Sequence, residues 1–302
     1  MAGCAPHMKP VTLELGGKDP MVLTEDVSMK AILPWVMRGC FQNCGQNCCG
    51  IERVYAYDSI YDTFLEQVKP LVEALNQGNP NDDKEVPDCG AMVMNQQLHL
   101  IQSLVDDAVK KGAKILVGGK FDSSQKGNFY PPTLLVNVTN EMRIAKEEVF
   151  GPVMAVTRVP KDSDEECLRL LHEVCPFGLG ASVYSGSQER AFKGIGQHIQ
   201  SGMLTINDFG VNYLIQSLPF GGWNESGFGR FAGPEGLRAC CHERSIVLDK
   251  LPSIIRTSIP PPLQYPMTKS SFKFGNSLIQ LFYNDGSILA KLKAIVTLCK
   301  GG

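Results

Sequence analysis

The sequence predicts an α/β fold in which a largely parallel β-sheet is covered by helices on both faces. Segments with helical periodicity alternate with short apolar, β-branched runs along most of the chain. Helices of this length connect parallel strands by crossovers, which bury both faces of the sheet. The composition is that of an ordinary soluble globular protein, because 43% of the 302 residues are hydrophobic and 20% are charged.

The first part of this alternation holds two strands and two helices. The segment Val11–Leu15 is apolar apart from one carboxylate and ends at two glycines. Apolar residues recur at helical spacing over residues 60–75 and 98–108, and Gly112 is suited to end the second helix. Residues 114–117 (KILV) are then expected to form a strand.

The second part continues the same pattern. Strands are expected over residues 152–156, 181–184 and 203–206. Helices are expected over 162–172 and 188–200, and the first of these has an acidic first turn that suits the helix dipole. These elements complete the predicted sheet and its covering helices.

The chain changes character after about Leu218. Residues 219–236 contain six glycines, so no regular element is expected there. Residues 245–248 (SIVL) are expected to form an isolated strand. The tail over 251–302 has six Lys or Arg and one Asp, in basic amphipathic stretches that can lie on a membrane surface. The alternative is that the tail packs on the protein's own core or on an oligomer partner.

Charge and cysteine content narrow the class of protein. The formal net charge of -2 argues against nucleic acid as a partner. The longest apolar runs fall far short of the ~20 residues that span a membrane. The first residues carry no basic or long apolar region, so we expect no signal peptide, free thiols for the eleven cysteines and a cytoplasmic location.

The cysteine-rich segment over residues 41–50 (FQNCGQNCCG) is the most informative stretch. A cysteine beside glycines at a helix or loop terminus can be a low-pKa nucleophile, because backbone N–H groups stabilise its thiolate. Cys40, Cys44 and Cys48 also recur at i, i+4 and i+8, which would place three thiols on one helix face as metal ligands. No second cysteine pair supports that reading. Buried structural cysteines are the third alternative.

Glu14 is the second candidate catalytic residue. Its neighbours Leu13 and Leu15 point to the opposite face of a strand. A lone carboxylate in apolar surroundings has a raised pKa, which suits a general base near neutral pH. A solvated glutamate at a strand end is the alternative.

Two motifs together resemble the aldehyde dehydrogenase superfamily. Residues 13–18 (LELGGK) resemble its glutamate signature and residues 41–48 (FQNCGQNC) its cysteine signature, with Glu14 and Cys48 34 residues apart as in the family. Further matches follow in order at residues 147–153, 202–207 and 219–230. The resemblance covers roughly residues 9 to 250 and implies a three-layer αβα catalytic domain over residues 15–220, followed by a Gly-rich return and an oligomerisation strand over 221–250.

The resemblance implies roles for five residues. Cys48 would attack the aldehyde carbonyl, and Glu14 would activate water to hydrolyse the resulting thioester. Glu148 and Gly16 would bind the cofactor, Glu148 through the nicotinamide ribose, and Phe150 would pack near the nicotinamide ring. The implied cofactor is NAD, with NADP not excluded, the substrate is a small aldehyde, and the family implies a homo-oligomer. No metal site is expected.

In the family a cofactor-binding domain precedes the glutamate signature, and here residues 1–14 are expected to be its remnant. We therefore expect reduced or no activity from this chain alone. An inactive fragment that pairs with a full-length subunit is the alternative, and a cofactor-independent thiol hydrolase is a third. The tail, with Trp223 and Phe228, resembles a plant-type, family 22 branch, whose full-length members look membrane-anchored at the N-terminus.

Overall fold

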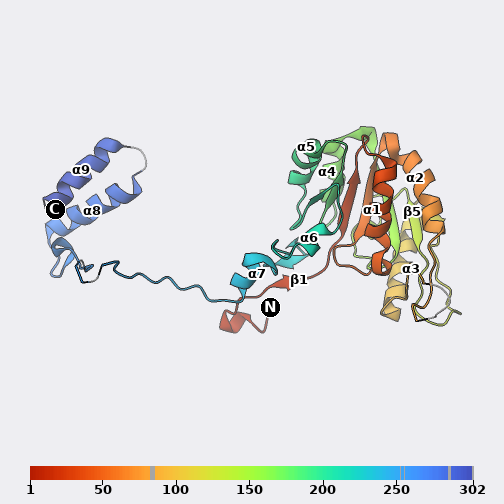
Figure 1. Ribbon diagram of the computed structural model, residues 1–302, viewed down its shortest axis with the longest axis horizontal. Helices are drawn as coiled ribbons and strands as arrows, with labels where there is room; N and C mark the ends of the chain where they lie inside the picture. The colour runs from red at the N-terminus through yellow and green to blue at the C-terminus, as the bar shows by residue number, and fades with distance from the viewer. Residues whose placement is uncertain (82–85, 252, 255, 285–286, 301–302) are drawn as a thin grey trace. The chain divides into compact units, whose positions relative to one another are not determined.

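The computed structural model describes residues 1–81, 86–251, 253–254, 256–284 and 287–300 (Figure 1). Its contacts divide the chain into two compact units, Met1–His242 and Glu243–Gly302. The division falls after His242, between the boundaries at 220 and 250 that the motifs suggest. Each unit is described by itself.

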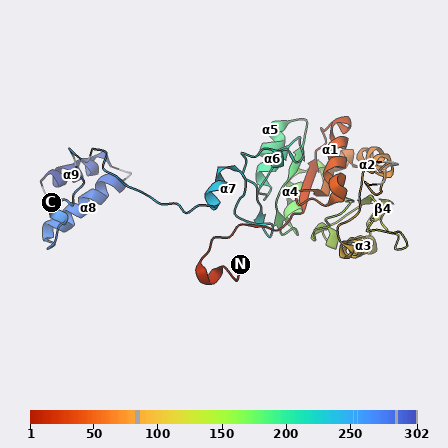
Figure 2. The same cartoon turned by 60° about the horizontal axis from the view of Figure 1, so that its bottom comes forward.

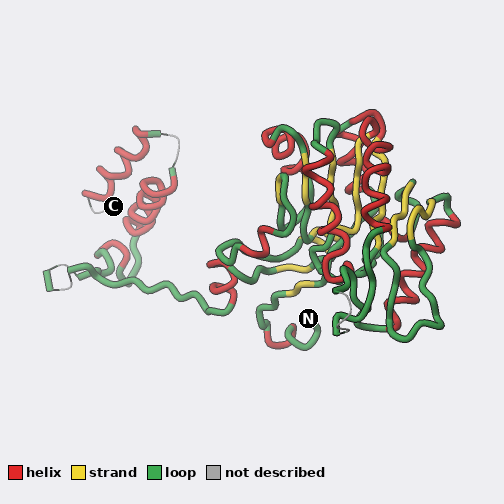
Figure 3. The backbone as a smooth tube through the Cα atoms, turned by 45° about the vertical axis from the view of Figure 1, so that its right-hand side comes forward, coloured by secondary structure: helices red, strands yellow, loops and turns green. Residues whose placement is uncertain are grey.

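A seven-stranded sheet forms the centre of the first unit (Figure 3). The strand order is β4-β5-β6-β3-β2-β8-β9, and every neighbouring pair is parallel except β4 with β5. The strands of this sheet are β2 (Asp19–Leu23), β3 (Ile51–Tyr57), β4 (Lys114–Val117), β5 (Thr133–Val136), β6 (Val153–Val159), β8 (Ser182–Tyr184) and β9 (Thr205–Ile206). The predicted, largely parallel α/β architecture is confirmed.

Helices cover the sheet on both faces (Figure 1). Helix α1 packs on β3 and β6, beside α2. On the other face, the Tyr57 hydroxyl of β3 donates to Asp164 of α4 at 2.6 Å, and Arg53 donates to the Leu171 carbonyl of α4 at 3.2 Å. The helices of the first unit are α1 (Met29–Phe41), α2 (Asp58–Glu73), α3 (Asn95–Lys110), α4 (Asp164–His172), α5 (Gln188–Arg190), α6 (Val211–Leu214) and α7 (Gly233–Ala239). Short 3-10 turns lie at Ala5–His7, Gln42–Gly45, Arg143–Ala145, Pro160–Asp162 and Gly196–His198.

Most elements expected from periodicity are confirmed. Helix α3 contains the predicted segment over 98–108, and α2 covers the one over 60–75 as far as Glu73. Gly112, with φ +106°, follows the end of α3. Strands β4, β6, β8 and β9 overlap their predicted ranges. The predicted helix over 188–200 is not a uniform α-helix, since α5 passes into a π-turn at Ala191–Ile195 and then a 3-10 turn.

Periodicity identified no element between residues 16 and 59, where the structure has β2, α1 and β3. Every residue of β2 and β3 is buried. A strand with two buried faces has no alternation of apolar and polar residues, so the pattern that predicts half-buried strands is absent. Helix α1 contains Pro34, a residue that also lowers the helical signal.

Two short antiparallel ladders lie outside the seven-stranded sheet. Strand β1 (Leu13–Glu14) pairs antiparallel with β11 (Gly227–Phe228), and β10 (Trp223–Asn224) pairs with β7 (Phe177–Gly178). The expectation that residues 219–236 lack regular structure is therefore wrong. Glycines allow this close pairing: a Cβ at Gly227, with φ +108°, would lie 2.1 Å from the Leu13 carbonyl oxygen.

The expected strand over 245–248 is not formed in the single described chain. Ile246, Val247 and Leu248 are exposed and have no regular secondary structure. A lone segment cannot satisfy its backbone groups as a strand unless another strand edge lies beside it. Pairing of this segment with another subunit remains a prediction.

The second unit contains a helical hairpin. After a turn at Pro261–Leu263, helices α8 (Lys269–Tyr283) and α9 (Ile288–Cys299) lie side by side, as Figures 1 and 2 both show. Of the helices in the described part of the chain, none is long and apolar enough to cross a membrane.

Candidate active site

The predicted site residues meet at the amino ends of the parallel strands. Glu14 and Gly16 precede β2, Cys48 precedes β3, and Glu148 precedes β6. Backbone N–H groups in the segments before β2 and β6 need hydrogen-bond acceptors, and here they donate to carboxylates: Gly17 to Glu148, and Val149 and Phe150 to Glu52.

Cys48 lies in a turn between the end of α1 and β3 and is half-buried. The pKa of its thiol is lowered, chiefly by a hydrogen bond from the side chain of Cys49, and the Cys49 backbone N–H adds to this effect. Burial and the nearby Glu14 carboxylate act in the opposite direction. Cys49 is buried, and its thiol is also 3.4 Å from the Asn47 amide oxygen. The more exposed thiol of the pair is therefore the one that ionises first.

Glu14 lies close enough to Cys48 to raise the pKa of the thiol through its charge and through a side-chain hydrogen bond. The structure thus brings the two predicted catalytic residues together. The expectation of apolar surroundings for Glu14 is wrong, however. Glu14 is exposed, and Leu15 is 54% exposed. Strand β1 pairs only with β11, so the two leucines beside Glu14 do not enclose it.

The Glu148 carboxylate lies against the backbone of Gly16 and Gly17. The Gly17 N–H donates to Glu148 Oε1 at 3.1 Å, and a Cβ at Gly16 would lie 2.5 Å from the same oxygen. Partial burial raises the pKa of the Glu148 carboxyl to about 7, against the lowering effect of the Gly17 hydrogen bond. Gly17 also adjoins Cys48, since a Cβ at Gly17 would lie 2.8 Å from the Cys48 carbonyl oxygen.

A buried ion pair between Lys18 and Glu52 stabilises this arrangement. Lys18 Nζ and Glu52 Oε2 are 2.6 Å apart, and neither side chain is more than 5% exposed. The same Glu52 carboxylate accepts the N–H groups of Val149 at 2.8 Å and Phe150 at 2.7 Å. Glu52, on β3, thus ties this strand to the loop of Glu148. Phe150 is half-buried and holds φ +46°, a strained value for its residue type.

Two more buried charges extend the network. Burial raises the pKa of Asp19, whose carboxylate accepts the Gly180 N–H at 2.9 Å. Arg53 donates from Nε to the Lys18 carbonyl at 2.9 Å. The sequence analysis missed Lys18, Asp19, Glu52 and Arg53. The signal that could have found them is a pair of adjacent charges at the start of each of two apolar strands.

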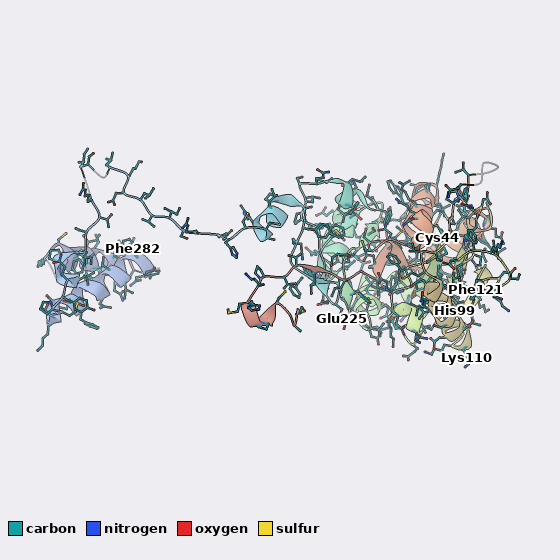
Figure 4. All side chains as sticks on the ribbon, turned by 90° about the horizontal axis from the view of Figure 1, so that it is seen from below. Cys44, His99, Lys110, Phe121, Glu225 and Phe282 are labelled. Carbon is teal, nitrogen blue, oxygen red and sulfur yellow. The ribbon has the colours of Figure 1, made fainter. Side chains whose placement is uncertain are left out.

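The helix face proposed for a metal site does not form. Helix α1 ends at Phe41, one residue after Cys40. Cys44 follows with a left-handed backbone at φ 58°, and Cys48 lies in a later turn. Figure 4 marks Cys44 in this region. Among the residues that the structure describes, no group of three or more His, Cys, Asp or Glu is placed to hold a metal ion.

A pocket of about 500 Å³ opens beside Cys48 and Cys49. Trp35 and Arg38 of α1 line one side, and Tyr213 and Leu214 of α6 line another. The pocket combines aromatic surface with polar side chains beside Cys48, a combination typical of small-molecule sites.

The fold and the site together define an α/β protein with a thiol of lowered pKa among carboxylates at the amino ends of parallel strands. The sequence model of the aldehyde dehydrogenase family matches residues 1–246, and the chain belongs to this family.

Known proteins agree with this assignment. An aldehyde dehydrogenase-like protein of Schizosaccharomyces pombe is 43% identical over 93% of this chain and 53% of its own length. One from Saccharomyces cerevisiae is 39% identical over 98% of this chain and 46% of its own length. The betaine aldehyde dehydrogenase of Staphylococcus aureus, solved with NAD+, superposes with a TM-score of 0.72 at 31% identity, over 79% of this chain and 46% of that one. The chain spans about half the length of the curated relatives it matches.

Proposed function

We propose that Cys48 is the nucleophile in the oxidation of an aldehyde to a carboxylic acid. The observation that carries this proposal is the thiol itself, half-buried, with a lowered pKa, and open to a pocket of about 500 Å³. A thiolate both attacks a carbonyl carbon and leaves again readily, so one residue can start and end the reaction. The small-molecule partner is an aldehyde.

The free state of all eleven cysteines supports a cytoplasmic location for the protein.

Glu148 and the Gly16–Gly17 turn suit the ribose of a nicotinamide cofactor. The carboxylate keeps one oxygen on the Gly17 N–H and can accept hydroxyl protons with its remaining lone pairs. Gly16 has no side chain, so the Glu148 carboxylate can lie against it. NAD(P), when bound there, would supply the acceptor for the hydride that the Cys48 adduct must lose on oxidation to a thioester.

Glu14 acts as the general base for the second half of the reaction. From its position beside Cys48 it takes a proton from water, and the water oxygen adds to the thioester carbonyl. The C–S bond then breaks, which releases the carboxylic acid and returns the Cys48 thiolate. An exposed carboxylate has direct access to that water.

The first test separates thiol chemistry from cofactor chemistry. The purified chain is treated with p-nitrophenyl acetate, which acylates a thiolate without any cofactor. We expect Cys48→Ser to abolish the release of nitrophenol, whereas Glu14→Gln leaves one fast turnover and slows the next. Cys240→Ser, at an exposed thiol far from the site in sequence, is the control. Unchanged acylation in Cys48→Ser would refute the assignment.

The second test measures NADH production with a panel of aldehydes. Since the chain spans about half the length of its relatives, we propose reduced or no turnover for these 302 residues alone. Turnover at the rate of longer family members would contradict that part of the proposal and leave the role of Cys48 intact.

Pairing with a longer subunit is the second candidate function. The exposed apolar segment over residues 246–248 favours it, because sheet extension needs an unpaired segment with β-branched residues. Co-purification with a tagged longer copy tests the idea. Val247→Asp should abolish pairing, and Val93→Asp, at another exposed valine, should not.

A further inference from the structure

The hairpin of α8 and α9 buries little of its own apolar surface. The two helices meet through a narrow set of residues, of which Ser271, Phe274 and Ser277 on α8 and Ala294 on α9 are buried. Serine and alanine allow close packing and bury few apolar atoms. Phe274 is the large apolar side chain in this set, and most of the other large apolar side chains on the two helices are exposed.

On α8 these side chains form one outward face. Phe272, Ile279 and Tyr283 recur at i, i+7 and i+11, which places them on one side of a helix. Phe272 is 79% exposed, and Phe282, marked on the hairpin in Figure 4, is 71% exposed.

Helix α9 carries a second apolar face of the same kind. Ile288, Leu292 and Ile295 recur at i, i+4 and i+7, and Leu289 and Val296 widen the stripe. All five side chains are exposed. A helix in water ordinarily buries such a stripe, so this face calls for a partner.

The charges within the two helices have a single sign, and the one Asp of the tail, Asp285, belongs to the connection between them. Lys269 and Lys273 on α8, with Lys291 and Lys293 on α9, are the charged residues within the bounds of the two helices. At about 100° of rotation per residue, Lys291 and Lys293 fall on the two sides of the α9 stripe. Lysines in such flanking positions can lay their aliphatic stems on an apolar layer and extend their ammonium groups toward anions.

We propose that this hairpin docks on an anionic lipid bilayer surface, with the apolar faces in the headgroup region and the lysines on lipid phosphates and carboxylates. The charge pattern favours this partner, because the charged residues of both helices are all lysines, which complement a surface of anionic lipid. Helices of 15 and 12 residues fall short of the bilayer but suit the interfacial plane.

Vesicle co-sedimentation of the full chain tests this proposal. We expect binding to vesicles that mix phosphatidylserine with phosphatidylcholine, and weaker binding to phosphatidylcholine alone. Changing Lys269, Lys273, Lys291 and Lys293 together to Gln should weaken binding about 100-fold or more, at about fivefold per lysine. Raising the salt concentration should weaken wild-type binding in the same direction.

Two single variants separate the apolar contribution. Ile279→Glu and Ile295→Glu should each reduce vesicle binding, whereas Val93→Glu in the first unit should not. Circular dichroism and labelling of Cys48 check that each variant is folded. A chain that ends at Lys250 should not pellet with vesicles.

Several results would overturn the proposal. One is equal pelleting of wild type and the shortened chain. Another is pelleting that ignores the lysine variant, the glutamate variants and salt. Concentration-dependent self-association without lipid, lost in Ile279→Glu, together with no vesicle binding, would show instead that the faces join two copies of this chain.

Discussion

Gly16 and Glu148 are in direct contact, and the carboxylate of Glu148 fills the space that a side chain at position 16 would need. A Cβ at Gly16 would lie 2.5 Å from Oε1 and 2.8 Å from Oε2 of Glu148, and the φ of Gly16 is +81°. Two separate physical reasons therefore require glycine here. One is the left-handed backbone conformation, and the other is the space that the Glu148 carboxylate occupies.

Gly16→Ala, compared with a second glycine variant, separates the collision with Glu148 from the strain of the left-handed backbone. We expect it to lower the free energy of unfolding by about 2 kcal/mol, because both the left-handed strain and the collision act. Gly112→Ala is the matched control, since Gly112 has φ +106° and nothing lies within 4 Å of its added Cβ. It should cost about 1 kcal/mol from strain alone. Urea unfolding measures both, and equal losses would show that Glu148 moves aside freely.

The raised pKa of Glu148 predicts a dependence of stability on pH. Its ordinary value is 4.5 and its folded value is about 7, so between these limits the folded state holds a proton that the unfolded state has lost. The free energy of unfolding therefore falls as pH rises from 4.5 to 7. Glu148→Gln should remove about 1 kcal/mol of that fall, well below the full linkage value because the carboxyl is only partly buried.

The neighbouring Glu147 is the control for that measurement. A side-chain hydrogen bond from Arg143 lowers the pKa of Glu147, so its contribution has the opposite sign. Its stabilisation is present above pH 4.5 and is lost as the pH falls. Unfolding of wild type, Glu148→Gln and Glu147→Gln at pH 5 and pH 7.5 gives the comparison. A Glu148→Gln profile parallel to that of wild type would contradict the prediction.

The fold could be predicted from the sequence where one face of an element meets water. Helices α2 and α3 have that property, and their apolar spacing locates them. Strands β2 and β3 are buried on both faces and show no alternation. Residues 245–248 have strand-forming side chains, but strand formation also needs a neighbouring edge that a single chain does not supply.

The site could be predicted only as far as its motifs reach. Two short motifs and one loop contain Cys48, Glu14, Gly16 and Glu148, and this is why the four residues could be predicted to lie in one site. The Glu14 environment could not be predicted, because apolar sequence neighbours do not determine what lies across a strand. The Lys18–Glu52 pair is formed between residues 34 apart, and no local pattern connects them.

Replacing Glu14 should separate its two effects on Cys48. The Glu14 carboxylate raises the pKa of the thiol, so Glu14→Gln should increase the thiolate fraction at pH 7. We expect alkylation of Cys48 by iodoacetamide to become about two- to fivefold faster, while hydrolysis of the acyl-enzyme becomes slower. Mass spectrometry of the labelled peptide measures the first rate. Glu25→Gln is the control, because Glu25 pairs with Arg190 at the far end of β2, and slower labelling in Glu14→Gln would refute this view of the pair.

Removing one charge of the Lys18–Glu52 pair should lower the free energy of unfolding strongly, whereas removing both charges should lower it much less. Glu52→Gln leaves a fully buried ammonium group with no counter-charge and weakens two backbone hydrogen bonds to residues 149 and 150. We expect a loss of about 3 kcal/mol or more in the free energy of unfolding. Breaking the exposed pair of Lys69 and Glu73 by Glu73→Gln, as a control, should cost under about 1 kcal/mol.

The double variant Lys18→Met, Glu52→Leu tests whether the pair serves stability or position. It removes both buried charges, so urea unfolding should recover much of the stability that Glu52→Gln loses. The N–H groups of Val149 and Phe150 still lose their acceptor, however, so the Glu148 loop should shift. We therefore expect recovered stability without recovered affinity for NAD(P), measured by calorimetry in a longer family protein that carries the same pair. Recovery of both would show that Glu52 has no role in positioning Glu148.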